Sequence, residues 1–202
     1  MYQETTDRRV IRTRMKLFAA LQQLLDQKSV HAISVTEITK IAGIGRASFY
    51  RHFNDIEDIL KWRIQYEDRS LEPQLLKFQD KPFLDLTLFF LSSWMHRSNL
   101  LTSLIQANRM DILEQQLIND QRAVELIFKG KISNTRTPYR YKLLPDEMLE
   151  SSGATGYINS ILSSILSAIL VRWITGGKQE TPEQLTNIAM TTIKALATRF
   201  DN

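Results

Sequence analysis

Apolar residues recur at intervals of three and four along most of the chain, which is the spacing of one face of an α-helix. In the segment 7–25 these positions are Ile11, Phe18, Leu21, Leu24 and Leu25. The same spacing returns in 147–174 and after Pro182, and the piece that follows Pro82 is apolar on nearly every side. No segment shows the alternating pattern of a convincing β-strand. The pattern therefore predicts an all-α protein.

The stretch from Ser34 to Phe53 predicts two short helices joined by a tight turn. Ser34 and Glu37 have the spacing of a capping box, so the first helix should begin at Val35. Gly43 should end it, because a residue without Cβ readily takes the left-handed conformation. Gly45 is an acceptable, though not optimal, N-cap for the second helix.

The second short helix should have an outer and an inner face. Phe49 and Phe53, four residues apart, should anchor it to the core, and the first helix should add Ile38, Ile41 and Ala42. The outward residues are then Arg46, Ala47, Ser48 and Tyr50. A helix, a glycine turn and a second helix of this kind can place a recognition helix in the major groove of DNA. An ordinary helical hairpin shares the pattern.

The distribution of charge separates the first quarter of the chain from the rest. Residues 1–54 hold nine Lys and Arg against four acidic residues, a net charge of +5, whereas the whole chain has a net charge of +4. The remainder is therefore slightly acidic at −1. A cationic excess confined to the helix-turn-helix segment is expected of a domain that binds a polyanion, although a solvated basic face has the same composition. The Arg-rich start of the first helix could reach the phosphate backbone or a minor groove.

At these residues the sequence resembles the tetracycline-repressor (TetR) family of bacterial transcription regulators. Members usually show Ala-Gly-Val-Ser, three variable residues, Phe or Leu, Tyr, a variable residue, His or Tyr, and Phe. This chain reads Ala-Gly-Ile-Gly at 42–45, Arg-Ala-Ser at 46–48 and Phe-Tyr-Arg-His-Phe at 49–53, with Glu-Asp-Ile-Leu at 57–60. The match covers about the first 60 residues, and the remainder is similar mainly in layout. Ile56 stands at or near the place where many members have a lysine that meets a DNA phosphate.

The resemblance implies a DNA-binding head of three helices, in 1–54, and a helical domain in 55–202 that binds an effector and forms a homodimer. It implies a cytoplasmic regulator, usually a repressor, of a palindromic operator in double-stranded DNA, with no enzymatic activity and no cofactor. By the resemblance and the outward pattern, the DNA-binding residues are Thr36, Lys40, Gly45, Arg46, Ala47, Ser48, Tyr50 and His52.

The resemblance also implies that a small molecule binds among the central helices. Aromatic and methionine side chains suit an apolar ligand, although each is individually more typical of a core. The candidates are Phe89, Phe90, Trp94, Met95, Met110 and Tyr157. A regulator controlled by a protein partner remains an alternative. A helical ligand carrier or enzyme whose basic head is incidental is another.

Several further boundaries are expected from the sequence. Asn54 should cap a linker helix that Pro73 ends, one helix should run from Met110 to about Ile132, and 133–145 should be a long loop. A second capping box at Thr181–Gln184 should start the last helix. The long helix 147–174 has an apolar stripe and a stripe of small residues, Ser160, Ser163 and Ser167. We expect the last two helices to form the dimer interface, with the serine side toward the partner.

The sequence lacks the residues that disulfides, thiolate sites or a metal site would need. The chain has no cysteine, which excludes disulfides and thiolate sites, and the three histidines are scattered without the spacing of a metal site. We expect no metal. The N-terminus has no apolar core of a signal peptide, and the segment 158–174 contains Asn159, four serines and Arg172, so it is too polar to span a membrane.

Overall fold

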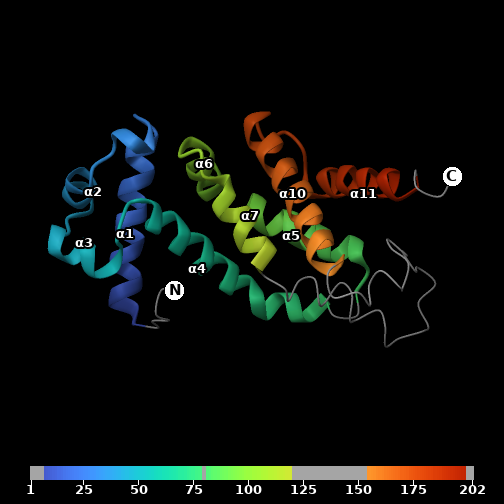
Figure 1. Ribbon diagram of the computed structural model, residues 1–202, viewed down its shortest axis with the longest axis horizontal. Helices are drawn as coiled ribbons and strands as arrows, with labels where there is room; N and C mark the ends of the chain where they lie inside the picture. Colours follow the sequence, from blue (N-terminus) through green and yellow to red (C-terminus); the bar gives the residue numbers. More distant parts are fainter. Residues whose placement is uncertain (1–6, 79–80, 120–153, 199–202) are drawn as a thin grey trace. The chain divides into compact units, whose positions relative to one another are not determined.

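The computed structural model describes residues 7–78, 81–119 and 154–198, and these residues form helices and no strand (Figure 1). The α-helices are α1 (Arg8–Leu25), α2 (Val35–Ala42), α3 (Arg46–His52), α4 (Glu57–Leu75), α5 (Phe83–Met95), α6 (Ser98–Gln106), α7 (Met110–Asn119), α10 (Ala154–Thr175) and α11 (Pro182–Thr198). Short 3-10 turns lie at Val30–Ala32 and Leu76–Phe78. The all-α prediction is confirmed. The expected loop 133–145, the helix beyond Asn119 and the residues 147–153 lie outside the described residues.

The described residues divide into two compact units. The first unit holds the residues up to Asp68 together with Thr102–Ile112, and the second unit holds Arg69–Leu101 and the residues from Leu113 onward. The first unit therefore extends past the expected domain boundary at residue 54 and includes a segment from the middle of the chain. The functional division into 1–54 and 55–202 stays a prediction.

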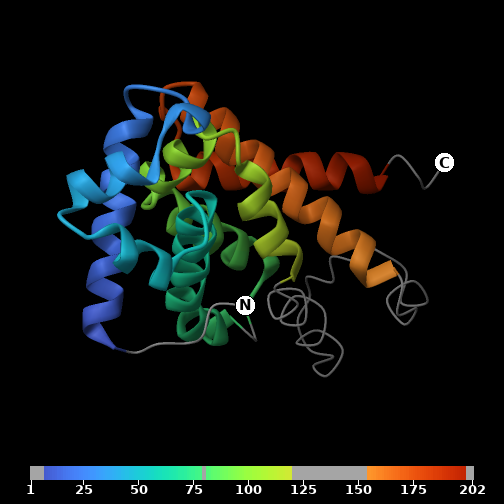
Figure 2. The ribbon, with the colours of Figure 1, turned by 60° about the vertical axis from the view of Figure 1, so that its left-hand side comes forward.

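The core of the first unit lies where α2 and α3 meet α1, and both short helices lie on the same side of α1 (Figures 1 and 2). Helix α1 begins after Asp7, whose side chain accepts a hydrogen bond from the Arg9 amide at 2.8 Å, as an N-cap does. The fully buried side chains of this core are Leu17, Leu21, Ile38, Phe49, Phe53, Ile59, Leu60 and Ile64. The apolar spacing of these segments thus marks the faces that pack together.

Two details of α4 differ from the sequence-based expectation. Asp55, not Asn54, caps the helix: its carboxylate accepts the Asp58 amide at 2.8 Å, while the Asp58 carboxylate accepts the Asn54 amide at 3.0 Å. Pro73 does not end the helix but lies in its last turn, two residues before the end at Leu75. Proline lacks the N–H that would bond to the carbonyl four residues earlier. Because only two residues of the helix follow Pro73, little helix remains to be disrupted.

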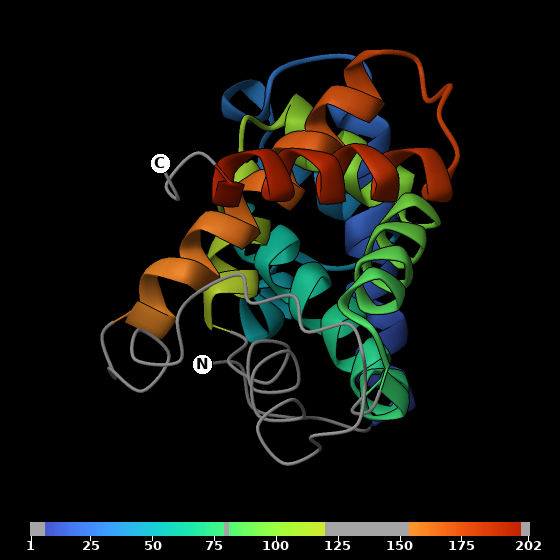
Figure 3. The same cartoon turned by 90° about the vertical axis from the view of Figure 1, so that its right-hand side faces the viewer.

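The second unit is built on α5, α10 and α11, with α11 crossing α10 (Figure 3). Its core contains Phe83, Leu86, Leu162, Met190 and Ile193. The capping box of α11 is confirmed, because the Thr181 amide donates to Gln184 at 2.8 Å and the Gln184 amide donates to the Thr181 hydroxyl at 3.3 Å.

The serine stripe of α10 faces the interior of its own chain. Ser163 and Ser167 are buried, and the Ser163 hydroxyl lies 3.4 Å from the Asn159 side chain, which itself donates to the Ile118 carbonyl at 2.7 Å. The expectation that this side faces a partner subunit is therefore wrong for Ser163 and Ser167. Small side chains here let neighbouring helices of the same chain approach closely.

Candidate nucleic-acid interface

The turn between α2 and α3 has the local structure that its sequence predicts. The Ser34 hydroxyl accepts the Glu37 amide at 3.3 Å, and the Glu37 carboxylate accepts the Ser34 amide at 3.0 Å, so the capping box is complete. Lys28 donates to Glu37 at 2.5 Å, and this bond, with those from Ser34, lowers the pKa of Glu37 to about 2. Gly43 closes α2 with a φ of 65°, in the left-handed region.

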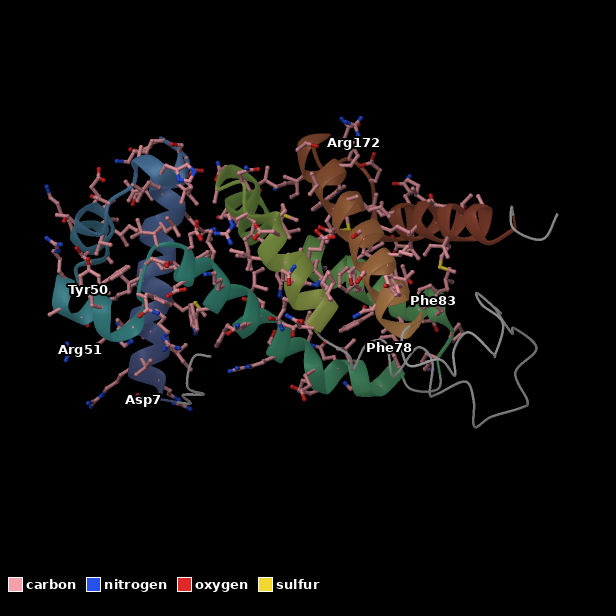
Figure 4. All side chains as sticks on the ribbon, viewed as in Figure 1. Asp7, Tyr50, Arg51, Phe78, Phe83 and Arg172 are labelled. Carbon is pink, nitrogen blue, oxygen red and sulfur yellow. The ribbon has the colours of Figure 1, made fainter. Side chains whose placement is uncertain are left out.

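Helix α3 presents one face to the core and the other to solvent. Phe49 is fully buried and packs against Phe53, with ring centroids 6.1 Å apart, and Phe53 packs against Trp62 of α4 at 6.0 Å. Tyr50 is 52% exposed, and Figure 4 shows it with Arg51 on the side of α3 that faces away from α1. The aromatic contacts fix the rotation of α3 about its axis, and this rotation determines which side chains a DNA groove would meet.

Most of the residues expected to bind DNA are accessible. Ser48 and His52 are half-buried, and the exposed residues are Thr36, Lys40, Gly45, Arg46, Ala47 and Tyr50. The inward assignment of Ile41 was wrong, because its side chain is 43% exposed; Thr39 is the buried residue at the end of α2. Arg51, which the family pattern treats as variable, is also exposed. Its spacing of four from Ala47 could have placed it on the same face.

The exposed cations of the first unit are distinct from those held in ion pairs. Lys28, Lys61, Arg63 and Arg109 pair with carboxylates of this unit. Within the described ranges, no carboxylate pairs with a second set, namely Arg8, Arg9, Arg12, Lys16, Lys40, Arg46 and Arg51, all of which are exposed. Cations that are not neutralised by the protein are those that can replace the counterions of a phosphate backbone.

Burial affects two basic side chains near the end of α3, His52 of α3 and Arg14 of α1. The pKa of His52 lies below its ordinary value because the ring is partly buried and because Arg14 and Arg51 are close. The guanidinium of Arg14 itself is buried over the rings of Phe53 and Trp62, at 5.6 and 5.7 Å from their centroids. Arg14 therefore stabilises the aromatic contacts behind α3 and is not part of the exposed cationic set.

The residues expected to bind an effector belong to both units. Trp94 and Met95 are buried in α5 of the second unit, and Phe89 and Phe90 are half-buried there. Met110 belongs to the first unit. Tyr157 is 76% exposed in this chain, and its place in an effector site stays a prediction. Tyr157 shares the face of α10 that carries the exposed Ile161 and Ser164.

In the described parts of the chain, no cluster of three His, Cys, Asp or Glu side chains is arranged to hold a metal ion. No helix in the same ranges combines the length and apolarity needed to cross a bilayer.

Comparison with known proteins finds sequence similarity in the head. Residues 17–61 match the model of the bacterial regulatory proteins of the tetR family. An uncharacterized HTH-type transcriptional regulator of Bacillus subtilis, YxbF, is 42% identical over 60 residues, which cover 29% of this chain and 16% of that protein. An HTH-type transcriptional regulator of Staphylococcus aureus is 31% identical over 70 residues, covering 35% of this chain and 38% of the relative. The matched region thus spans well under half the length of either relative.

Three solved structures share the fold over nearly the whole chain. Lin0861 of Listeria innocua has a TM-score of 0.74 at 14% identity and covers 96% of both chains. The dihydroxyacetone kinase operon activator DhaS has a TM-score of 0.54 at 18% identity, covering 93% of this chain and 97% of its own. A protein of Syntrophomonas wolfei assigned to the TetR family of transcriptional regulators has a TM-score of 0.55 at 17% identity, covering 92% and 95%. At these identities the likeness concerns the fold alone.

The turn between α2 and α3 and the exposed outer face of α3 are the features of a helix-turn-helix. The matched residues 17–61 run from within α1 to the start of α4, and so contain this helix-turn-helix. Residues 17–61 of the N-terminal domain are thus similar to the bacterial regulatory proteins of the tetR family.

Proposed function

We propose that this protein is a sequence-specific DNA-binding regulator of transcription, acting as a repressor in the bacterial cytoplasm. The observation that supports this most directly is the outer face of α3, where Arg46, Tyr50 and Arg51 are exposed while Phe49 and Phe53 fix the helix from behind. Arg46 is in the first turn of α3, the part of a recognition helix that reaches base edges. Arginine reads guanine through two parallel hydrogen bonds.

The first test is a gel-shift assay against the promoter DNA beside the protein's own gene, over a range of salt concentrations. Arg46→Ala should weaken operator binding by about 1–3 kcal/mol and relax base preference at one position of the half-site. Lys40→Ala should weaken binding to all sequences alike and lower the salt slope by about one. Lys81→Ala is the matched control, because it removes the same charge from an exposed position just before α5 in the second unit.

The outcomes separate the proposal from its alternatives. Retention of the promoter that does not exceed the retention of random DNA at any salt concentration would reject sequence-specific binding. Equal operator affinity in the wild type and in Arg46→Ala would remove this side chain from base readout while leaving the function intact.

The proposal includes control by an apolar small molecule that binds the second unit. Its support is the aromatic composition of α5, where Phe89 and Phe90 are half-buried and Phe78 stacks on Phe89 with ring centroids 4.8 Å apart. Linkage requires that an effector which lowers DNA affinity binds less tightly to the DNA complex by the same factor. Compounds from an apolar library should therefore raise the melting temperature and lower operator affinity together. A ligand that stabilises the protein but leaves operator affinity unchanged would contradict this control.

A further inference from the structure

A segment from the middle of the chain belongs to the same compact unit as the helix-turn-helix. This segment, Thr102–Ile112, is the corner at which α6 ends and α7 begins, and we refer to it as the α6–α7 corner. Both helices continue into the second unit, since residues 98–101 of α6 and 113–119 of α7 are assigned there. The corner is therefore a covalent continuation of the second unit that is packed with the head.

The corner is a defined turn. Asn108 has a φ of 54°, in the left-handed region, and its amide donates to the Ile105 carbonyl at 2.9 Å. The next amide, that of Arg109, donates to the Leu104 carbonyl at 2.8 Å. Leu104 and Ala107 are buried within the same unit. Because the backbone is hydrogen-bonded and its apolar side chains are buried, the direction in which Arg109 leaves the turn is fixed.

Three side-chain contacts join the corner to the head. Ser103 accepts from Gln22 of α1 at 3.1 Å, and Gln106 donates to Asp26, just after α1, at 3.2 Å. The third contact is an ion pair between Arg109 and Glu57, the first residue of α4. These contacts restrain both the end of α1 and the start of α4.

Arg109 is held between two carboxylates. Its Nε and Nη2 donate to the Asp111 carboxylate at 2.8 and 3.0 Å, which leaves Nη1 for Glu57. The Asp111 bonds raise the pKa of Arg109, with a smaller contribution from Asp55. The Arg109 side chain is 23% exposed and that of Glu57 is 38% exposed, so the pair is partly shielded from solvent. Asp111 thus orients the fork that reaches Glu57.

The position of Glu57 gives this ion pair its importance. Helix α3 ends at His52 and α4 begins at Glu57, so four residues separate the recognition helix from the residue that Arg109 holds. Phe53, one of those four, is fixed against Trp62 of α4. A displacement of the start of α4 would therefore displace the end of α3 with it.

We infer that Arg109 is a positioning residue for the recognition helix, and that the α6–α7 corner sets the DNA affinity of the head through its ion pair with Glu57. This inference rests on the proposed DNA-binding function. Loss of the pair widens the range of positions that the recognition helix samples, and ordering it again on DNA costs free energy.

The test compares Arg109→Gln, Glu57→Gln and the double variant in the full-length protein. Operator affinity should fall about two- to fivefold in each single variant, the range for a partly exposed ion pair. The double variant should be no weaker than the weaker single variant, because both substitutions break the same contact. Lys61→Gln is the matched control. Lys61 lies on α4, as Glu57 does, but pairs with Asp58 and not with a residue of the corner.

The sign of the Glu57→Gln effect distinguishes positioning from simple electrostatics. Removing a carboxylate from a DNA-binding head raises its affinity for a polyanion if only charge matters. Positioning requires the opposite, a weaker complex. Arg109→Lys keeps the charge but lacks the guanidinium fork that binds two carboxylates. Its operator affinity should therefore lie between that of Arg109→Gln and that of the wild type. Affinity in Glu57→Gln that equals or exceeds that of the wild type would overturn the inference.

A second measurement needs no DNA and separates this inference from the proposed function. Amide hydrogen exchange at Trp62, Arg63 and Ile64 should accelerate about two- to fivefold in Arg109→Gln and in Glu57→Gln, but not in Lys61→Gln. If the wild type proves not to bind DNA specifically, accelerated exchange still supports the link between the corner and α4. Exchange rates equal to those of the wild type in both variants would reject it.

Discussion

The two glycines that flank the turn of the helix-turn-helix have different conformational requirements. Gly43 has a φ of 65° and a ψ of 38°, where an L-residue is strained. Gly45 has a φ of −69° and a ψ of 147°, which any residue can adopt, and a Cβ added there would meet no atom within 4 Å. As the N-cap of α3, Gly45 also leaves the first amides of that helix without a side-chain acceptor.

Gly43→Ala and Gly45→Ser should therefore change stability in opposite directions. We expect Gly43→Ala to lower the free energy of unfolding by roughly 1 kcal/mol through left-handed strain. Gly45→Ser should raise it by about 0.5 kcal/mol, because serine caps the helix and restricts the unfolded chain. Urea denaturation followed by circular dichroism measures both. A destabilised Gly45→Ser variant would show that the N-cap geometry of α3 is wrong.

Arg14 shows what residue counting does not reveal. The sequence places it among the nine basic residues of the segment 1–54, but its side chain is buried over Phe53 and Trp62. Lys28 is likewise held by Glu37. The net charge of the segment alone fits a solvated basic face as well as a polyanion partner. Which cations remain available depends on contacts between helices, which no local spacing encodes.

At the scale of the element, α3 depends on one buried ring. Phe49 has no exposed surface, and its ring lies 5.3 Å from that of Tyr50 and 6.1 Å from that of Phe53. Truncating it would leave a cavity between α3 and the rest of the head, whereas Tyr50 is half exposed. The two neighbouring aromatics therefore form a matched pair of test sites.

Phe49→Ala should cost about 3–5 kcal/mol, enough to unfold the head or bring it close to unfolding. Tyr50→Ala should cost less than about 1 kcal/mol, yet it should weaken operator binding if its side chain faces the groove. Differential scanning calorimetry together with the gel shift separates the two effects. Unchanged melting in Phe49→Ala would contradict the inward orientation of this ring.

Helix boundaries set by short-range hydrogen bonds could be predicted from the sequence. The capping boxes at Ser34–Glu37 and Thr181–Gln184 both form, because each partner lies within three residues of the other. The face that a helix buries was less predictable. Ser163 is buried because Asn159 beside it bonds to the end of α7, a contact more than 40 residues apart in the sequence. The same limit applies to Tyr157, which residue type and the family resemblance put among the effector-binding candidates and which is exposed.

At the scale of the whole molecule, α10 has a buried face and an exposed face. The buried side chains include Asn159, Leu162, Ser163, Ser167, Leu170 and Trp173. The exposed positions follow the same helical spacing on the opposite side and are Tyr157, Ile161, Ser164, Ala168 and Arg172. Ile161 is 57% exposed and Ile188 of α11 is 50% exposed. Large apolar side chains on the outer faces of both helices are suited to association between copies of the chain.

We therefore expect a homodimer in which the outer face of α10, and not the serine side, meets the partner. One helix-turn-helix reads few base pairs, and two copies about 34–36 Å apart, or a multiple of that distance, can read a palindrome. Ile161→Glu and Ile188→Glu should each weaken association, since each places a charge where an apolar side chain would be buried.

Analytical ultracentrifugation at micromolar concentration measures the assembly state against a chain mass of 23.5 kDa. Gln179→Glu is the control, because it adds the same charge at an exposed position between α10 and α11. A monomeric Ile161→Glu variant that keeps the wild-type melting temperature of the head, but loses operator binding, would locate the interface and show that both heads are needed. A wild type that sediments as a monomer would exclude the dimer, and a dimeric Ile161→Glu variant would place the contact on another face.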